Sequence, residues 1–485
     1  MVFSSHLFVF YFLPLALLVY YMLPRRGKHL GLTILSYVFY GWANPMFVFL
    51  MLGSTLIDYI AGLAQAFNGF RGWRGPIKQL EEGAGRTRTQ KLALAASIVS
   101  NLSLLGFFKY FNFSVDNYNS LMGLAGLQHL QLEHVMRITL PLGISFYTFQ
   151  SMSYSIDVYR GQAKPLKNFI DFACYVSMFP QLVAGPIIRF SEVADQLEHR
   201  TCTMDKFARG VALFALGMAK KILLANACGK IADTAFNAGS VGAFDAWYGA
   251  AAYAFQIFFD FSAYSDMAIG LGLMLGFVFA KNFDMPYRSQ SITEFWRRWH
   301  ISLSSWLRDY LYIPLGGNRK GTARIYVNLA LVMVLGGLWH GASWNFVIWG
   351  AIHGGMLAFE RAQGKTSFYH HLPKLFRVAL TFAIVVVAWV FFRASDLPGA
   401  LEYLRSMFGM GSVQPGAALL SGIIYQPYYV VSFLAGVLAV WAVPDVWDWT
   451  QRITWPKAAF CTAALFVSIL VLVTQEYNPF IYFIF

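Results

Sequence analysis

Residues 255–276 read FQIFFDFSAYSDMAIGLGLMLG, and their only charged side chains are Asp260 and Asp266. A helix needs about 20 apolar residues to cross the hydrocarbon core of a bilayer, so this stretch predicts a transmembrane helix. A carboxylate without a partner is very unfavourable in apolar surroundings, so both acids must be paired, protonated or in contact with water. Lys220 and Lys221, in another apolar stretch, are possible partners. The acids either cross-link helices or are functional, as a proton relay or an orienting partner for a histidine, and they are candidates for contact with a substrate.

The same composition extends along the whole chain. Hydrophobic residues make up 57% of its 485 residues and charged residues only 13%, whereas about 25% of the residues of a soluble domain are charged. Lipid must therefore cover most of the surface, and we predict one all-α polytopic membrane domain over residues 1–485. Four cysteines, none of them in a CxxC pair, predict neither a disulfide framework nor a metal site.

About 11 transmembrane helices are expected from the apolar stretches. They cover residues 7–23, 29–43, 45–66, 91–109, 137–158, 207–227, 248–280, 325–360, 376–393, 425–443 and 458–474. The stretch 169–188 is interrupted by Pro180 and Pro186. It is predicted to be re-entrant, which requires that it pack inside protein.

The distribution of charge indicates the topology. The net charge is +13, and basic residues are concentrated in loops 67–91, 160–206 and 281–324. The loops between them, 111–136, 228–247 and 394–424, hold at most one Lys or Arg each. By the positive-inside rule the basic loops face the cytoplasm, and both termini are then predicted to be periplasmic. The same rule explains the positive charge without a nucleic-acid partner.

Residues 282–320 hold the densest set of candidate site residues, in the sequence NFDMPYRSQSITEFWRRWHISLSSWLRDYLYIPLGGNRK. Apolar residues at helical spacing predict one amphipathic helix over 292–310. This helix either lies on the cytoplasmic leaflet through its aromatic residues or presents its arginines to an anionic substrate, because arginine binds phosphate through paired hydrogen bonds. The candidates are Trp296, Arg297, Arg298, Trp299 and Arg308, with His300 beside them as a catalytic partner, a cavity-lining residue or an interfacial ring.

Residues 335–353 read LGGLWHGASWNFVIWGAIH and place His340 among small and aromatic residues. An ionisable side chain at membrane depth is costly and marks a candidate functional site. Burial favours the neutral imidazole, which can act as a general base or as a nucleophile. The alternative is a neutral core histidine bonded to a backbone carbonyl, and this alternative is favoured for His353. Asn345 is a further candidate for contact with a substrate.

Several long motifs, occurring together in one order, resemble the membrane-bound O-acyltransferase family. Three of them are FDFSAYSDMAIGLGLMLGF, the segment 282–319 and GLWHGASWNFVIWGAIHG. Three more, MVFSSHLFVFYFLPL, LPLGISFYTFQSMSYSIDVYRG and PQLVAGPIIRF, are similar to the branch of the family that O-acetylates bacterial polysaccharides. The resemblance implies helices around a central tunnel, with His340 as the essential catalytic residue and His300 as a second, supporting residue on the cytoplasmic side.

The resemblance further implies an O-acetyltransferase of the bacterial inner membrane that uses cytoplasmic acetyl-CoA as donor and has no tightly bound cofactor. The acceptor is expected to be a periplasmic acetyltransferase of the SGNH type, with a Ser-His-Asp triad, which then modifies an exported polysaccharide. Alginate is the polymer that the resemblance favours, with cellulose or peptidoglycan as alternatives. A transporter without acyl-transfer chemistry is the competing hypothesis, because it also explains Asp260, Asp266 and His340 in apolar stretches.

Overall fold

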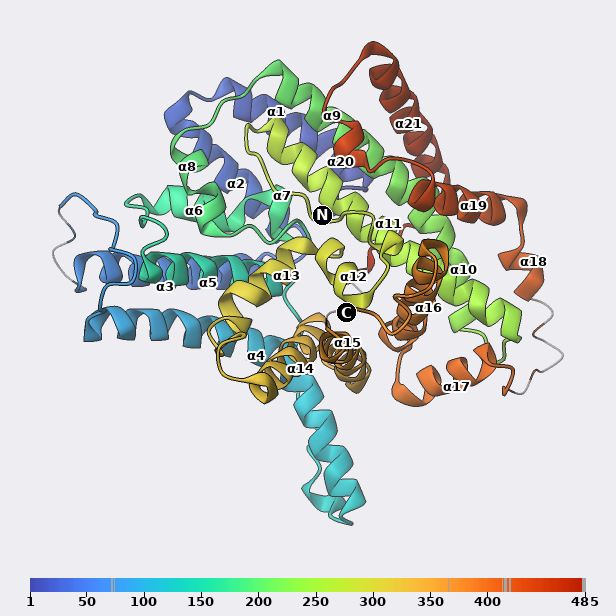
Figure 1. Ribbon diagram of the computed structural model, residues 1–485. Helices are drawn as coiled ribbons and strands as arrows, with labels where there is room; N and C mark the ends of the chain where they lie inside the picture. The colour runs from blue at the N-terminus through green and yellow to red at the C-terminus, as the bar shows by residue number, and fades with distance from the viewer. Residues whose placement is uncertain are drawn as a thin grey trace. The chain divides into compact units, whose positions relative to one another are not determined.

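The computed structural model describes residues 1–70, 73, 75–364, 366–411, 413, 417 and 420–481. All its regular elements are helices, as predicted (Figure 1). Among the described residues, seven helices are long and apolar enough to span a membrane: Met46–Phe67, Arg88–Leu124, Met204–Phe236, Ala243–Met274, Thr322–His340, Lys374–Arg393 and Trp455–Thr474. Shorter apolar helices cover Phe8–Met22 and Pro427–Trp441. The total of about 11 spans stays a prediction.

The chain divides into two compact units, which are described separately. The first consists of Met1 and Leu7–Thr201, and the second of Val2–His6 and Cys202–Phe485. The helices of the first unit are α1 (Leu13–Met22), α2 (Lys28–Gly41), α3 (Met46–Phe67), α4 (Arg88–Leu124), α5 (Ile144–Arg160), α6 (Phe169–Ser177), α7 (Phe179–Leu182) and α8 (Phe190–Glu198).

Polar side chains join the helices of the first unit. Asp58 on α3 accepts hydrogen bonds from Ser97 Oγ (2.5 Å) and Asn101 Nδ2 (2.9 Å) on α4. The predicted re-entrant stretch contains the short helices α6 and α7, and residues 172–188 are all buried. Its irregular backbone is therefore packed inside protein, as such backbone must be at membrane depth.

The second unit holds all the candidate site residues. Its first half contains α9 (Met204–Ala219), a π-helical turn (Lys220–Ala225), α10 (Asn226–Phe236), α11 (Ala243–Met274), α12 (Ile292–Arg298), α13 (Ile301–Leu307) and a second π-helical turn (Arg308–Tyr312). Its second half contains α14 (Thr322–His340), α15 (Trp344–Ala362), α16 (Lys374–Arg393), α17 (Leu397–Met407), α18 (Ser421–Ile424), α19 (Pro427–Trp441), α20 (Val446–Trp449) and α21 (Trp455–Thr474).

The acids on α11 have the partners expected from the sequence. Lys220 Nζ lies 2.7 Å from Asp266 Oδ2, and Lys221 Nζ lies 2.9 Å from Asp260 Oδ1. The two lysines begin the π-helical turn between α9 and α10, and this turn packs against α11. The two ion pairs neutralise the charges that would otherwise be costly between apolar helices.

Helices α14 and α15 form a tight antiparallel pair that ends at His340. A Cβ added to Gly337 would collide with the backbone carbonyl of Phe346, and one added to Gly350 would collide with that of Met333. The two backbones are therefore in direct contact, as small residues permit between membrane helices. The predicted stretch 325–360 is confirmed as helical, and the structure resolves it into two helices joined by a turn.

Replacing Gly337 by alanine is expected to separate α14 from α15 and to lower the free energy of unfolding by about 1–3 kcal/mol, the usual cost of overpacking. The measurement is thermal or denaturant unfolding of the purified chain in detergent. Gly355→Ala is the matched control, because nothing lies within 4 Å of a Cβ added to Gly355 on α15. Equal stability of the two variants would contradict the close approach at Gly337.

The prediction of one amphipathic helix over 292–310 is wrong. The chain leaves helical geometry at Trp299, and His300 has φ 44° and ψ 57° in the left-handed region. Trp299 and Trp306 are buried within the protein rather than presented to a surface. The break follows from tertiary contacts, because Ile301 N donates to the carbonyl of Asn282 at 2.8 Å and holds the chain in this bend.

Candidate functional site

His340 is the last residue of α14 and is surrounded by aromatic rings. Its ring centroid lies 5.0 Å from that of Trp339, 5.4 Å from Trp349 and 5.2 Å from Phe392. The side chains come from α14, α15 and α16, so the pairing of α14 with α15 sets their arrangement. Only 7% of His340 is exposed. This setting excludes bulk water from most of the imidazole while leaving part of it accessible.

Two cavities meet at His340. The larger has a volume of about 510 Å³ and is open, with walls formed by α12, α13, α14 and α15. The smaller, of about 10 Å³, is lined by His340 with apolar and aromatic residues: Ile257, Phe261, Trp299, Trp389, Phe392 and Ile481. Among the described residues, His340 is the one that lines both spaces. A group bound in the larger cavity can therefore reach the imidazole, and the second space lies against the same side chain.

Asn282 holds His300 in its left-handed conformation. The Oδ1 atom of Asn282 accepts a hydrogen bond from Ser302 N at 3.1 Å and lies 3.3 Å from His300 Nδ1. Its Nδ2 atom donates to Ser265 Oγ on α11 at 2.8 Å. A non-glycine residue in this region of φ and ψ costs roughly 1–3 kcal/mol, and such strain is concentrated at functional sites. In this conformation the His300 ring centroid lies 4.6 Å from that of Phe261 and 6.2 Å from that of Trp339.

His300 is neutral in this environment. Complete burial lowers the pKa of its imidazole well below the usual range, and the nearby His340 lowers it further. Because Asn282 Oδ1 is an acceptor, the proton of the neutral ring belongs on Nδ1. Nε2 is buried and has no hydrogen-bond partner among the described residues. His300 lines neither cavity, so its contact with the site runs through neighbouring rings.

The predicted substrate-binding residues fall into separate groups. Trp296, Arg297 and Arg308 line the larger cavity, and Trp299 lines the smaller space. The others lie elsewhere and have protein partners. Arg298 pairs with Glu294 (2.8 Å), Asp260 and Asp266 pair with the two lysines, and Asn345 Nδ2 donates to the carbonyl of Ala394 (2.9 Å). His353 accepts a hydrogen bond from Trp296 Nε1 at 3.2 Å, as a core histidine would.

Arg361 was not predicted, although it lines the larger cavity from the last turn of α15. A cation in the last turn of a mostly apolar helix is the signal that was available in the sequence. Asn282 and Trp389 were also missed, and for them no local signal exists. Their roles depend on contacts with residues distant in the chain, such as the 5.1 Å approach of the Trp389 and Trp299 rings.

The larger cavity carries an excess of positive charge. Arg297, Arg308 and Arg361 line it without any acidic residue in the same wall. Arg308 is paired with Asp309 at 2.7 Å, whereas Arg297 and Arg361 form no ion pair within 4.0 Å in the described part of the chain. Serine and threonine hydroxyls, Trp296, Tyr312 and Asn318 also belong to the polar part of the wall. An anionic ligand with an apolar or neutral end directed at His340 fits this distribution.

Comparison with known proteins identifies the family. The pattern of the membrane-bound O-acyltransferase family matches residues 87–395. The chain is 44% identical over 508 residues to the probable alginate O-acetylase AlgI of Pseudomonas putida, and the alignment covers 100% of both chains. It is 49% identical over 440 residues to the probable alginate O-acetylase AlgI of Pseudomonas aeruginosa, covering 89% of this chain and 81% of the relative.

A further relative is named for a different polymer. The peptidoglycan O-acetyltransferase of Helicobacter pylori is 37% identical over 448 residues, covering 85% of this chain and 81% of the relative. The matched family region contains both His300 and His340, and with them most of the wall of the larger cavity. The resemblance drawn from the sequence motifs is thereby confirmed, and the chain belongs to the membrane-bound O-acyltransferase family as a membrane-embedded O-acetyltransferase.

Proposed function

We propose that this protein takes an acetyl group from cytoplasmic acetyl-CoA and delivers it across the inner membrane to a periplasmic acetyltransferase of the SGNH type. That partner then O-acetylates an exported polysaccharide, for which we propose alginate. One observation carries the proposal: His340 lines both an arginine-bearing cavity of about 510 Å³ and a second space of about 10 Å³. The imidazole can therefore meet a donor bound in the larger cavity. The smaller space, with room for about one water, marks the side from which we propose that the acceptor hydroxyl arrives.

The donor side is supported by charge. Coenzyme A carries several phosphates, and arginine binds phosphate through short, paired hydrogen bonds. Arg297 and Arg361 border the larger cavity and have no carboxylate partner among the described residues. The positive-inside rule assigns the segment that contains Arg297 to the cytoplasm, where acetyl-CoA is made. The thioester would then point from the arginines toward His340.

The chemistry at His340 follows from a neutral imidazole. As a general base it removes the proton of the acceptor hydroxyl, whose oxygen attacks the carbonyl carbon of the thioester. The carbon–sulfur bond breaks, and the departing coenzyme A thiolate takes the proton from the imidazolium. In the alternative route the imidazole attacks the carbonyl carbon of the thioester, the carbon–sulfur bond breaks and coenzyme A leaves as thiolate. The acceptor hydroxyl then takes the acetyl group from the imidazole, and its proton passes to the thiolate. Both routes need the access from two sides that the geometry around His340 supports.

The choice of polymer rests on the relatives. The two Pseudomonas proteins are named as probable alginate O-acetylases, at 44% and 49% identity. The Helicobacter relative, named as a peptidoglycan O-acetyltransferase, is 37% identical. The transporter hypothesis loses its main support, because Asp260 and Asp266 are ion-paired rather than spread along a path.

The proposal is tested with the purified full chain in proteoliposomes, with radiolabelled acetyl-CoA outside and a candidate SGNH-type partner. We expect release of free coenzyme A and appearance of label on the partner. When alginate is also present, the radiolabel should pass from the partner to the alginate. Intact acetyl-CoA after incubation with chain and partner would refute acetyl transfer, whereas label on the partner that never reaches alginate would refute only the polymer assignment.

Replacing Arg297 or Arg361 by alanine is expected to raise the KM for acetyl-CoA by roughly 10- to 100-fold, because a hydrogen bond to a charged group contributes about 1.5–3 kcal/mol. The kcat should change less, since neither residue contacts the reacting atoms. Initial rates measured over a range of acetyl-CoA concentrations separate the two constants. Arg324→Ala is the control, because Arg324 is exposed and lines neither cavity. An unchanged KM in both variants would remove the arginines from donor binding.

A further inference from the structure

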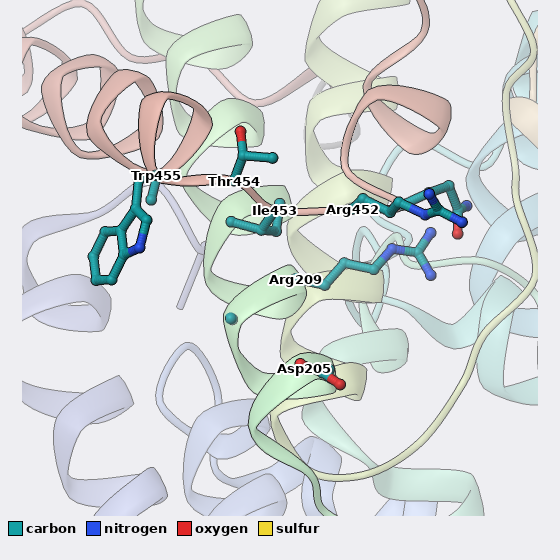
Figure 2. Close-up of a pocket in the computed structure, with 9 residues that line it drawn as sticks. Asp205, Arg209, Arg452, Ile453, Thr454 and Trp455 are labelled. Carbon is teal, nitrogen blue, oxygen red and sulfur yellow. The ribbon is translucent and has the colours of Figure 1, made fainter.

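A second open pocket lies in the same unit, formed by other residues than those around His340. It has a volume of about 730 Å³ and is enclosed by the beginning of α9 and by the segment from α20 to α21 (Figure 2). Arg209 on α9 and Arg452 before α21 supply its basic groups, and Ala208, Ile453 and Trp455 supply apolar surface. The proposed acetyl transfer makes no use of this pocket.

Arg209 is partly buried without satisfying its donors. Its Nε and Nη2 atoms are inaccessible to solvent and have no hydrogen-bond partner among the described residues. The guanidinium lies 4.7 Å from the ring centroid of Trp447, a cation–π contact that fixes its position. Leaving these charged donors without acceptors costs free energy, because a buried donor that loses its water and gains no acceptor pays the full desolvation penalty. The arrangement therefore lacks an anionic acceptor.

Arg452 brings a second positive charge to the same place. Figure 2 shows the guanidinium groups of Arg209 and Arg452 extending toward the same side of the pocket. Neither forms an ion pair within 4.0 Å in the part of the chain that the structure describes. Two like charges that share a partly dry pocket repel each other. An anion held between them would remove this repulsion and would also satisfy the open donors of Arg209.

The nearby acids are directed elsewhere. Asp205 lines the pocket one helical turn before Arg209, yet it forms no ion pair with either arginine. Asp448 lies 3.3 Å from Lys281 Nζ, which also contacts Asp284 and Asp445. These carboxylates contact the lysine. Asp448 also attracts Arg209 electrostatically, but it forms no ion pair with either arginine in the described part of the chain. The pocket accordingly keeps its capacity for an external anion.

The surroundings identify the class of anion. The pocket lies at the ends of two helices long and apolar enough to span a membrane, Met204–Phe236 and Trp455–Thr474. Trp455 is 87% exposed at the first residue of α21, as is typical of the aromatic belt at a membrane–water interface. Only 17% of the apolar window of α21 is buried inside the protein, so that helix offers surface to acyl chains. Basic pockets of this kind bind the headgroups of anionic lipids.

We propose that Arg209 and Arg452 bind the phosphodiester of an anionic phospholipid, whose acyl chains lie along the exposed face of α21. The positive-inside rule assigns the start of α9 to the cytoplasmic leaflet. The site is independent of the acetyl-transfer proposal, because its residues contact neither His340 nor the larger cavity. A free phosphate would use the same two arginines but would gain nothing from Trp455 and the apolar wall.

The test titrates the purified full chain in detergent with phosphatidylglycerol, phosphatidylcholine or inorganic phosphate and follows bound lipid by native mass spectrometry. We expect wild type to bind phosphatidylglycerol at least tenfold more tightly than phosphatidylcholine. Arg209→Gln and Arg452→Gln should each lose about tenfold in affinity for phosphatidylglycerol, equivalent to about 1.4 kcal/mol. Arg324→Gln, at an exposed arginine outside the pocket, should bind as wild type does.

The thermal midpoint of unfolding is measured for each variant without lipid, so that a folding defect in Arg209→Gln is distinguished from loss of the lipid site. Arg452 is exposed, so Arg452→Gln tests the site without disturbing the core. Unchanged phosphatidylglycerol affinity in Arg452→Gln and in a folded Arg209→Gln would overturn the proposal. If millimolar inorganic phosphate bound to the same two arginines as tightly as phosphatidylglycerol does, the lipid assignment would be overturned in favour of a phosphate site.

Discussion

Replacing His340 by alanine is expected to abolish the proposed acetyl transfer from acetyl-CoA while the chain remains folded in the membrane. Acid–base catalysis by a positioned side chain contributes about 10²–10⁴-fold to a rate, and a nucleophilic role would make the loss larger. The ring is small, sits at the end of α14 and borders two spaces. Its removal therefore enlarges a cavity that already exists and leaves the helix pairing at Gly337 intact.

The measurement is coenzyme A release by purified variants at equal protein concentration, with membrane abundance checked by immunoblot. His353→Ala is the matched control, because His353 is a buried histidine on α15 that lines neither cavity. It should lose stability through its contacts with Trp296 and Phe295 but keep most of its kcat. Full transfer by His340→Ala at normal abundance would remove this histidine from the mechanism.

Replacing Asp260 by alanine is expected to lower the free energy of unfolding by about 3–5 kcal/mol, the usual cost of leaving one partner of a buried ion pair alone. The side chains of Asp260 and Lys221 are 2% and 3% exposed, so water cannot replace the missing carboxylate. Asp260 Oδ2 also accepts a hydrogen bond from Ile481 N at 2.8 Å, and Lys221 Nζ donates to the carbonyl of Pro479. The same substitution therefore also removes a hydrogen bond that holds the segment 479–481 against α11.

Denaturant unfolding in detergent measures the loss. The double variant Lys221→Met with Asp260→Leu should recover most of it, since replacing both partners removes the uncompensated charge. Glu192→Gln is the control, because Glu192 and Arg189 form a partly exposed pair at 2.8 Å whose loss costs about 0–1 kcal/mol. A single variant Asp260→Ala as stable as wild type would mean that Lys221 finds another acceptor or loses its proton.

The helix pattern was predictable because it is local. Apolar stretches long enough to cross a bilayer can be recognised from the local sequence. The stretches at 45–66, 376–393 and 458–474 coincide closely with α3, α16 and α21. The pairing of the acids on α11 with Lys220 and Lys221 was also predictable, because charges in apolar stretches have few possible partners. The motifs around His300 and His340 were enough to indicate the family.

The site was predictable only in part. His340, Arg297 and Trp296, which the motifs singled out, all line one cavity, but Arg298, a neighbour of Arg297, points to Glu294 instead. Helical spacing could not distinguish the two, because the helix breaks at Trp299 and the periodicity over 292–310 does not continue through it.

The amino-acid sequence alone determined that this chain is a membrane protein and which of its stretches become helices. It also identified His340, in a glycine-rich apolar stretch, as the candidate catalyst. Tertiary structure decided the bend at His300, the inclusion of Arg361 in the cavity wall, and the contact of His340 with two separate spaces. The physical reason is range: helix formation and the mean hydropathy of a segment depend on residues within a few turns of one another. The left-handed conformation of His300 depends on Asn282, 18 residues away, and the cavity depends on helices that meet only after folding.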